Sequence, residues 1–482
     1  MARRFCALKY LAAGLAVAAW AQMTAAPALA LDTTTSAFPL QVSADGRHIV
    51  DHAGKAFRIN ADAAWFMSSQ GVAPEVDEYL DNRKLKGFNT VVLMLMTHLD
   101  PINRAGQGPF TVADDFSTPN EAYFSFIDTI LDKAAARGMV VLLAYTYLGY
   151  QGGDEGWWSM ITNAKNTASV CYEWGLWLGR RYGNRANIIW LAGGDFSPPA
   201  GSEGERRVYQ ILKGLKAGGA HQLVSAQWAP PDSLATDQAA FVDVIDINTI
   251  YGYGASNSGE TYRTAHRAYQ YEPTRPVVLF EPSYEGQRVG GSGLPQDVRR
   301  SQYWAVLGGA TAGQNFGTKG IWDWQQATWL DRVLGRQRSW RDRLETPGAL
   351  DMQRQFTLFH ALRWQELVPA ESLSGETSAP ITGQGDGSGH IALAVTRPRT
   401  WLVAYIPPTG SAPRTFGLNM SLLSRSARAR WYNPTTGDYV LIDPAIPNNG
   451  LHQFTTPGEN GTGTNDWLLV ADTPEEPGHR DQ

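Results

Sequence analysis

The sequence predicts an α/β fold, a (β/α)8 barrel of the TIM type, followed by an antiparallel β-sandwich. Apolar strand-like runs and amphipathic helix-like stretches alternate from about residue 57 to residue 324, which is the pattern of repeated β/α units. Eight such runs are present, the number that closes a barrel. Beyond about residue 370 the pattern changes to short strands separated by turn residues, which favours a sandwich.

Size and composition agree with two globular units. The chain has 482 residues, which is too long for a single ordinary core. Hydrophobic residues make up 43% and charged residues 18%, a composition typical of a folded protein. The 17 Trp and 19 Tyr have flat, amphipathic side chains, which suit both a core and the faces of sugar rings.

The first 30 residues have the features of a secretory signal. Arg3, Arg4 and Lys9 form a positive start, an apolar stretch covers residues 11–21, and residues 28–30 form a small-x-small cleavage site. Because the apolar stretch is too short to span a membrane, we expect an exported protein, periplasmic or extracellular, with no membrane insertion after cleavage. Cleavage after Ala30 changes the formal net charge from −5 to −8, which argues against binding nucleic acid or anionic membranes.

The elements of the barrel follow in order. Residues 38–57 predict a small β-flap of two strands at the bottom of the barrel. The eight strands are predicted over Phe57–Ala61, Thr90–Met96, Val140–Tyr145, Ile188–Ala192, Gln222–Ala226, Val244–Thr249, Val277–Phe280 and Gly320–Trp324. Helices are predicted over Pro74–Lys86, Asn120–Arg137, Asn166–Tyr182, Glu203–Ala217, Ser258–Tyr271 and Gln296–Gly308. A doubly wound sheet competes, but no Gly-x-Gly-x-x-Gly loop follows the first run.

A closing helix is predicted over residues 347–366. We therefore expect the barrel unit over residues 31–369, the sandwich over residues 370–472 and a disordered polar tail over residues 473–482. The strands of the sandwich are predicted over Ile391–Thr396, Thr400–Ile406, Ala429–Tyr432, Tyr439–Ile442 and Asp466–Ala471.

Cysteine and histidine usage argues against several kinds of site. Cys6 lies in the signal, so Cys171 is alone in the mature chain and forms no internal disulfide. Cys171 falls in a helical pattern, which indicates a buried structural cysteine. The nine His form no paired metal-ligand spacing, and no Gly-x-Ser-x-Gly follows a strand. We expect no metal, no cofactor and no serine nucleophile.

In a barrel of this kind, functional residues lie at the C-terminal ends of the strands. These positions hold aromatic, amide and carboxyl side chains, which suit a neutral ligand rich in hydroxyl groups. We predict that the ligand is bound by Asp62, Trp65, His98, Tyr145, Tyr147, Gln227, Trp228, Asn248, Tyr251, Tyr253, Tyr284, Trp322 and Trp324. Glu285 and Asp323 lie beside them.

Two acids at the same edge, Asp195 and Glu281, form the strongest candidate for catalysis. Each ends a buried-looking apolar run, and the two runs are the fourth and seventh strands. Cleavage of a glycosidic bond needs one acid to protonate the leaving oxygen and one carboxylate to attack or to activate water. Taken singly, Asp195 could instead cap the next helix and Glu281 could form a structural ion pair.

The loop after the third strand leaves two alternatives open. Asp154 and Glu155 form either a second acidic site or a substrate-binding loop. Trp157 and Trp158 form either a wall of the binding site or local packing. Asp62 is a rival acid, but its position fits binding of a hydroxyl group better than proton transfer.

These segments resemble a known family, the apiosidase-like glycoside hydrolases, which are bacterial (β/α)8 enzymes. The resemblance covers residues 40–471 and is carried by Phe57–Trp65, Tyr79–Asn89, Asn187–Asp195 and Val278–Glu281. Residues 430–437 look like the β-domain usually joined to these barrels, which is often labelled a putative collagen-binding domain. On a secreted glycosidase, such a domain more often stabilises the barrel or contacts glycan.

The resemblance implies that Asp195 is the general acid/base and Glu281 the nucleophile, with retention at the anomeric carbon. It also implies a β-linked apiosyl residue of a branched pectic side chain as substrate, although a relative could act on another furanoside or on a bacterial exopolysaccharide. The larger superfamily often has Asn-Glu at the end of strand four. Gly194-Asp195 stands there in this sequence, so the helper amide is missing and the contact to the sugar 2-hydroxyl is unassigned.

Two other functions compete with a hydrolase. One is a non-catalytic carbohydrate-binding or adhesion protein on a barrel scaffold, and the other is a transglycosidase with the same two acids.

Overall fold

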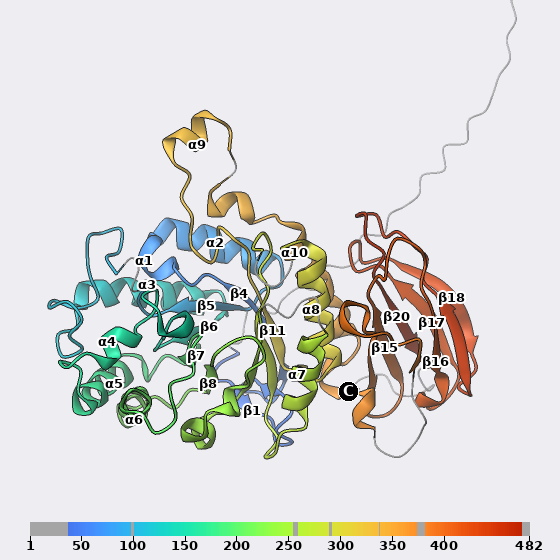
Figure 1. Cartoon of the computed structure of the whole chain (residues 1–482), viewed down its shortest axis with the longest axis horizontal. Coiled ribbons are helices and arrows are strands. Elements are labelled where there is room, and N and C mark those ends of the chain that lie inside the picture. The colour runs from blue at the N-terminus through green and yellow to red at the C-terminus, as the bar shows by residue number, and fades with distance from the viewer. Residues whose placement is uncertain are drawn as a thin grey trace, which may run out of the picture. The chain divides into compact units, whose positions relative to one another are not determined.

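The structure is a computed structural model of the chain (Figure 1). It describes residues 37–97, 101–253, 259–288, 292–336, 338–373 and 381–474. The expected signal, His98 and most of the expected tail lie outside these residues. Within the described part of the chain, no helix combines the length and the apolar character needed to cross a membrane.

Eight parallel strands form the barrel, and the predicted fold class is confirmed (Figure 1). They are β4 (Ile59–Ala63), β5 (Thr90–Met94), β6 (Val140–Ala144), β7 (Ile188–Gly193), β8 (Val224–Gln227), β9 (Asn248–Gly252), β10 (Val277–Pro282) and β11 (Gly313–Phe316). Their order is β8-β7-β6-β5-β4-β11-β10-β9. Side chains link the two end strands, because Ser225 Oγ donates to the Ile247 carbonyl at 2.8 Å and lies 3.2 Å from Thr249 Oγ1.

Helices follow most of the strands and cover the outside of the barrel. They are α1 (Met67–Gln70), α2 (Ala73–Leu85), α3 (Glu121–Ala136), α4 (Trp158–Thr162), α5 (Ala168–Tyr182), α6 (Glu203–Ala217), α7 (Glu260–Tyr269), α8 (Pro295–Leu307), α9 (Trp329–Val333) and α10 (Pro347–Ala361). Side-chain oxygens of Asn120, Thr167 and Ser202 accept backbone hydrogen bonds at the starts of α3, α5 and α6. These caps explain why the predicted starts are correct to within two residues.

The predicted eighth strand was wrong. Residues 320–324 form turns, and the strand is β11, seven residues earlier, with the sequence Gly-Gln-Asn-Phe. Its Gln314 and Asn315 are fully buried. A strand with two polar residues among four lacks the apolar run on which the prediction relied.

The predicted sixth strand was displaced. Residues 239–244 form a 3₁₀ helix and β9 begins only at Asn248. The alternating Val and Asp of this segment resemble a half-buried strand. Asp246 instead turns back to β8, where its carboxylate accepts a hydrogen bond from Val224 N at 2.8 Å.

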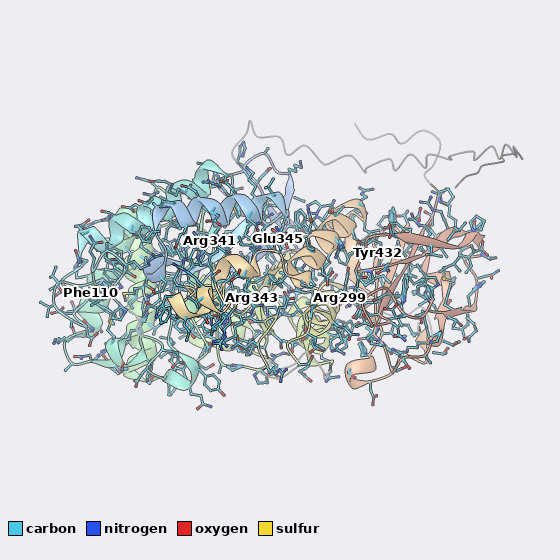
Figure 2. The ribbon with its side chains drawn as sticks, turned by 90° about the horizontal axis from the view of Figure 1, so that it is seen from above. Phe110, Arg299, Arg341, Arg343, Glu345 and Tyr432 are labelled. Atoms are coloured by element: carbon cyan, nitrogen blue, oxygen red, sulfur yellow. The ribbon has the colours of Figure 1, made fainter. Side chains whose placement is uncertain are left out.

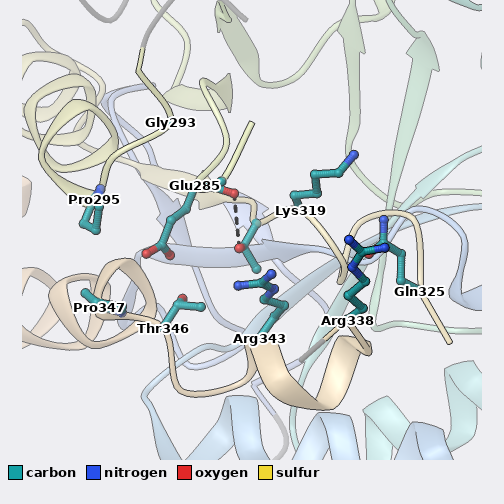
Figure 3. A pocket seen from close by; sticks show the side chains of 11 residues that line it. Glu285, Gly293, Pro295, Lys319, Gln325, Arg338, Arg343, Thr346 and Pro347 are labelled. Carbon is teal, nitrogen blue, oxygen red and sulfur yellow. Dashed lines mark hydrogen bonds between the residues drawn. The ribbon is translucent and has the colours of Figure 1, made fainter. Parts of the chain in front are cut away.

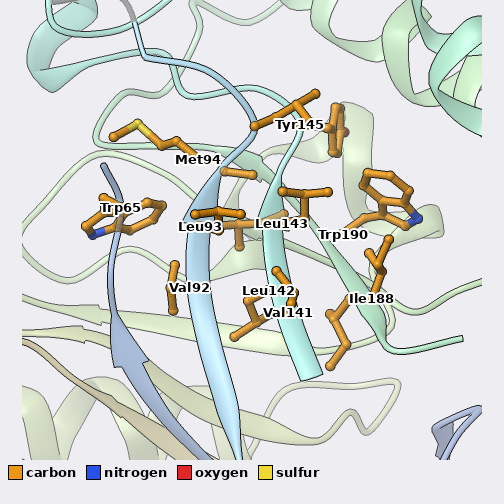
Figure 4. Packing of buried hydrophobic residues seen from close by; sticks show 14 of the residues in the cluster. Trp65, Val92, Leu93, Met94, Val141, Leu142, Leu143, Tyr145, Ile188 and Trp190 are labelled. Atoms are coloured by element: carbon orange, nitrogen blue, oxygen red, sulfur yellow. The ribbon is translucent and has the colours of Figure 1, made fainter. Parts of the chain in front are cut away.

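Strands β5, β6 and β7 are almost entirely apolar on both faces, which accounts for their continuous apolar runs. Val92, Leu93 and Met94 of β5 pack beside Leu142 and Leu143 of β6 (Figure 4). All five side chains are almost completely buried.

The N-terminal sheet has three short antiparallel strands where two were expected, β1 (Gln41–Val42), β2 (Ile49–Val50) and β3 (Ala56–Phe57). Arg47 donates to the carbonyl of Tyr269, at the end of α7. This contact lies on the side of the barrel where the strands begin, as expected for a flap at the bottom.

Two antiparallel sheets follow the barrel. One has the order β12-β14-β15-β20-β17-β18 and the other β13-β16-β19. The strands are β12 (Leu367–Pro369), β13 (Ile381–Thr382), β14 (Ala392–Thr396), β15 (Trp401–Ile406), β16 (Thr415–Asn419), β17 (Ala427–Tyr432), β18 (Tyr439–Ile446), β19 (Leu451–Thr455) and β20 (Trp467–Asp472). Strands β12, β13, β16 and β19 were not predicted, and β12 places the first strand of the sheet before residue 370.

A buried arginine joins the barrel to these sheets (Figure 2). Arg299 of α8 donates to Asp466, which precedes β20, from Nε at 2.8 Å and from Nη2 at 2.7 Å. Its Nη1 donates to Asp351 of α10 at 2.7 Å. The β-domain is therefore held to the outer helices of the barrel by charged hydrogen bonds that water does not reach.

Candidate active site

Glu281 reaches the mouth of the barrel through an irregularity in β10. The register between β10 and β9 pairs Leu279 with Ile250 and Glu281 with Tyr251, so Phe280 is an extra residue. Such a β-bulge bends a strand and changes the direction of the side chains beside it. The ring of Phe280 meets Trp65 edge-on at 5.8 Å, and Glu281 is only 6% exposed.

Asp195 is presented by an unusual backbone. Gly193, Gly194 and Asp195 all have positive φ, at 79°, 109° and 55°. This conformation is costly for a residue with a Cβ, and it occurs often at functional sites. A Cβ on Gly194 would come within 2.3 Å of the Tyr147 ring. The two glycines therefore let Asp195 approach Tyr147 closely.

Three neutral groups donate to the Asp195 carboxylate. Tyr147 Oη donates to Oδ2 at 2.9 Å, and Tyr251 Oη and Gln227 Nε2 each donate to Oδ1 at 2.8 Å. Gln227 Nε2 also donates to Glu281 Oε2. One amide nitrogen thus bridges the two acids.

Aromatic side chains surround Glu281 on its other side. Tyr284 hydrogen-bonds to Glu281 and accepts a hydrogen bond from Trp65 Nε1 at 2.9 Å. Tyr253 meets Tyr284 edge-on at 5.5 Å and Tyr251 at 6.4 Å. The structure therefore brings together two predicted acids and six predicted ligand-binding residues: Trp65, Tyr147, Gln227, Tyr251, Tyr253 and Tyr284.

Burial makes it difficult to ionise both acids. It raises the pKa of Asp195, against which the hydrogen bonds from Tyr251 and Tyr147 act. Burial and the nearby charge of Asp195 raise the pKa of Glu281 well above its ordinary value. Two like charges this close favour a state in which the pair holds one proton.

Asp62 does not belong to this group. It lies on β4 with its side chain toward α2, where Arg83 Nε donates to Oδ2 at 2.5 Å and Tyr79 Oη donates to the same oxygen at 2.7 Å. The residue is completely buried. The predicted contact with a ligand hydroxyl is therefore wrong, because alternate residues of a barrel strand face the outer helices.

Tyr145 and Trp228 also point away from the mouth. Tyr145 packs edge-on against Trp190 at 6.2 Å, far from Trp65 in Figure 4, and Trp190 in turn contacts Tyr182 of α5. Trp228 donates to the carbonyl of Ala235 at 2.8 Å. Both residues belong to the layer between strands and helices, which corrects their predicted binding roles.

The sixth and eighth strands lie elsewhere than predicted, and three further predicted residues do not join the acid pair. Asn248 is the first residue of β9, at the end opposite the mouth. Trp324 is buried, donates to Glu75 at 3.1 Å and stacks on Trp340. Trp322 is partly buried and its ring packs edge-on against Phe66. None of the three contacts the acid pair through a recorded hydrogen bond or ring contact in the described residues.

The loop after β6 answers one question left open by the sequence, the role of Trp157 and Trp158. Trp157 is fully buried and donates to the carbonyl of Met96 at 3.0 Å. Trp158 packs against Phe196 with the ring centres 5.0 Å apart. Both Trp side chains make local packing contacts, while the charge of Glu155 contributes to raising the pKa of Asp195. Cys171 is buried in α5, as expected.

Sequence reasoning missed the residues that shape the backbone around the pair. Thr146 Oγ1 accepts a hydrogen bond from Gly193 N at 3.1 Å, and Phe280 forms the bulge. Thr146 lies between Tyr145 and Tyr147, which were both predicted at the mouth, so its position in the sequence could have indicated that it lies there. A bulge depends on pairing between strands and has no signal in a single run of residues.

A cavity of about 510 Å³ lies among the loops that follow β10 and β11, and neither acid of the pair lines it. Its walls include Glu285, Lys319, Gln325, Arg338, Arg343 and Thr346 (Figure 3). Thr318 Oγ1 donates to the carbonyl of Glu285 at 3.2 Å, which ties together the loops after β10 and β11. Among the described residues, no group of three or more His, Cys, Asp or Glu could hold a metal ion.

Residues 43–366 match the sequence profile of the family described as "Apiosidase-like, catalytic domain". The chain belongs to the apiosidase-like family. Residues 380–472 match a second profile, described as "Putative collagen-binding domain of a collagenase". Curated proteins gave no match.

Solved structures of glycoside hydrolases are similar to the apiosidase-like chain. One, described only as a glycoside hydrolase, has a TM-score of 0.74 and 22% identity over 91% of this chain and 97% of its own. A glycoside hydrolase family 5 protein from Bacteroides vulgatus has a TM-score of 0.74 and 21% identity over 91% of this chain and 95% of its own. These likenesses agree with the barrel and sheets described above.

Membership of the family makes the protein an enzyme, a glycoside hydrolase, whose substrate is a carbohydrate. A non-catalytic binding protein, the competing function from the sequence, is set aside. Two acids within reach of one amide, surrounded by tyrosines and a tryptophan, are chemically suited to this activity.

Proposed function

We propose that the enzyme cleaves its substrate with retention, by a double displacement in which Asp195 and Glu281 take part. The observation that carries the proposal is the position of Gln227 Nε2, which donates to Asp195 at 2.8 Å and also to Glu281. When one nitrogen donates to two oxygens, those oxygens lie at most about 6 Å apart, so the two carboxyl groups are close together. Carboxyl groups about 5–5.5 Å apart favour retention, whereas inversion needs about 6.5–9.5 Å to admit water.

The depth of the two acids supports their separate roles. Glu281 is deeply buried among Trp65, Phe280 and Tyr284, where a sugar ring would stack. Asp195 is partly exposed and lies toward the solvent, where the leaving part of a glycan would extend. Glu281 is therefore proposed as the nucleophile and Asp195 as the acid.

The proton must lie on Asp195 when the reaction begins. Burial raises the pKa of both acids, so the pair can retain one proton in the free site. A bound sugar favours that proton on Asp195, because positive charge that develops at the anomeric carbon stabilises the Glu281 carboxylate beside it. The donors around Asp195 are all neutral, so they permit the proton to move there.

The reaction then has two steps. Asp195 protonates the leaving glycosidic oxygen while Glu281 Oε attacks the anomeric carbon, and the bond to the leaving group breaks. Asp195, now ionised, takes a proton from water, which attacks the same carbon and releases Glu281. Each step inverts the configuration, so the product retains it.

The proposed substrate is a β-linked apiosyl or similar residue of a complex polysaccharide. Family membership supports this choice. Export is also proposed, on the charged start, apolar stretch and small-x-small site of residues 3–30. Recovery of a chain that begins at Leu31 from the periplasm or medium of expressing cells would support export.

The experiment incubates the enzyme with plant and bacterial polysaccharides and identifies released sugars by chromatography, beside Glu281→Ala. Free apiose from the wild type alone supports the substrate and the nucleophile. A different sugar keeps the mechanism and replaces the substrate, and products joined to added acceptors indicate a transglycosidase. Activity retained in Glu281→Ala excludes Glu281 as nucleophile.

Stereochemistry gives an independent test. In Glu281→Gly, azide can enter the space left by the carboxylate and attack the anomeric carbon directly. A glycosyl azide of inverted configuration is expected. Wild-type hydrolysis that releases a sugar of inverted configuration, followed by NMR, would exclude retention.

A further inference from the structure

Gln227 has an unusual position for a buried amide. It is the last residue of β8 and only 3% exposed. Its Nε2 donates to Asp195 Oδ1 at 2.8 Å and to Glu281 Oε2. Its Oε1 is buried and has no hydrogen-bond partner among the described residues. A buried acceptor without a donor is costly, and here it lies beside the two acids.

The backbone of β7 explains why the amide comes from β8. Gly193 pairs with Gln227 in the sheet, and Gly194 N donates to the Gln227 carbonyl at 2.7 Å. Position 194 itself has no room for an amide, because a Cβ there would come within 2.3 Å of the Tyr147 ring. The residue before Asp195 is therefore excluded from the site, and Gln227 occupies the space between the acids.

We propose that Gln227 is both the positioning residue of the acid pair and a determinant of sugar specificity. Its Nε2 holds the two carboxyl groups at the short separation that retention needs. Its Oε1 accepts a hydrogen bond from the sugar hydroxyl on the ring carbon next to the anomeric carbon. This inference rests on the proposed function, and it names the chemical feature of the substrate that the site reads.

The ligand geometry follows from the reaction. The anomeric carbon must lie between Glu281, which attacks it, and Asp195, which protonates its leaving oxygen. Since Gln227 Nε2 contacts both acids, the amide lies beside that carbon. The 2-hydroxyl is the nearest hydroxyl to it, and binding supplies the donor that Oε1 lacks. A sugar without a 2-hydroxyl leaves this acceptor unpaired and is rejected.

The bridging role is tested without substrate, by the melting temperature of Gln227→Met from about pH 4 to about pH 8. Methionine has a similar shape and no amide. The hydrogen bond from Gln227 lowers the pKa of Glu281, so its loss makes the ionised acid costlier. The destabilisation of Gln227→Met should therefore grow as pH rises.

Gln222→Met is the matched control. Gln222 precedes β8 and donates to the carbonyls of Tyr182, Gly183 and Arg185. It lies at the other end of the strand, so its loss should lower the melting temperature by the same amount at each pH. A pH-independent difference in Gln227→Met as well would overturn the bridging role.

The hydroxyl contact is tested with the 4-nitrophenyl β-glycoside of the sugar that the wild type releases, and with its 2-deoxy analogue. The wild type should prefer the hydroxylated substrate by about 10- to 100-fold in kcat/KM. Gln227→Met should have a lower kcat and lose most of this preference, whereas Gln222→Met should keep it. An unchanged preference in Gln227→Met would overturn the contact. If the wild type releases no sugar, the proposed function fails, and the melting experiment alone decides the bridging role.

Discussion

Glu281 at the mouth of the barrel and Asp62 on the outward face of β4 are both buried, and Asp195 is partly buried. The surroundings of the acid pair and of Asp62 differ in charge. Asp62 accepts hydrogen bonds from Arg83 and Tyr79, and its ion pair with Arg83 is completely buried. Asp195 and Glu281 are surrounded by hydroxyl and amide donors, and no Lys or Arg of the described residues forms an ion pair with either. The negative charge of Asp62 is neutralised by Arg83, whereas no cation neutralises the charge of the acid pair among the described residues.

Under the proposed mechanism, this difference separates a structural acid, Asp62, from two reactive ones. A carboxylate fixed to a guanidinium stays ionised and holds its neighbours in place. A pair with neutral donors can exchange one proton, because no permanent cation stabilises the doubly ionised state. The apiosidase-like barrel thus has two kinds of acid, one paired with a cation and the other held by neutral donors. The arginine at the joint with the β-domain, Arg299, follows the structural pattern.

The largest effect is expected from Arg83→Met, which leaves the Asp62 carboxylate buried without its cation. The free energy of unfolding should fall by about 3–5 kcal/mol. Chemical denaturation followed by tryptophan fluorescence measures the loss. Adding Asp62→Asn to Arg83→Met removes both charges and should recover much of the stability. A loss below about 1 kcal/mol in the single variant would mean that Asp62 is not held as a charged group.

At the mouth of the barrel, removal of an acid is expected to raise the free energy of unfolding instead of lowering it. Glu281→Gln removes an acid whose folded pKa is raised well above 4.5, so its ionised form destabilises the fold at neutral pH. The wild type loses stability as pH rises above 4.5 through the raised pKa of Glu281, and the variant does not. Glu281→Gln should therefore be more stable by about 1–2 kcal/mol at pH 7, while turnover is abolished.

The pH dependence provides the check on this second prediction. Below about pH 4 the wild-type carboxyl is protonated in both states, so the advantage of Glu281→Gln should disappear. Melting temperatures at several pH values measure the trend. Asp62→Asn is the control, since it leaves Arg83 buried without its partner and should destabilise at neutral pH. Destabilisation in Glu281→Gln at pH 7 would contradict the view that the pair is strained by its own charge.

The two kinds of acid also show what the sequence could predict. Asp195 and Glu281 were found because each ends an apolar run, and the barrel follows from the repetition of such runs. Asp62 occupies the same kind of position, yet the alternation of β4 turns it toward α2. The sequence does not state which residue of a strand begins that alternation, and a bulge such as that at Phe280 changes it.

The remaining errors have a common physical cause. Strand β11 contains Gln314 and Asn315, which are buried by pairing and side-chain contacts that a single run does not reveal. Because the prediction put this strand too late in the sequence, it placed Trp324 at the mouth, whereas Trp324 belongs to the core. In contrast, Trp65, Tyr147 and Tyr251 were predicted correctly as neighbours of the strand ends, and the structure gathers them around the acids. Local pattern locates the mouth, and pairing decides which side chains face it.

The smallest effect is expected from Tyr147→Phe, which removes one neutral donor and keeps the ring that contacts Trp65. The hydrogen bond from Tyr147 lowers the pKa of Asp195, so its loss raises that pKa further. Asp195, as the proposed acid, must be protonated to act, so the basic limb of the kcat/KM profile should move to higher pH by about one unit. Tyr145→Phe is the matched control, because the Tyr145 hydroxyl is buried away from the mouth without a partner among the described residues. An equal shift in both variants, or none in Tyr147→Phe, would show that the neutral donors do not set the proton affinity of Asp195. The contrast with the arginine-bound Asp62 would then need another explanation.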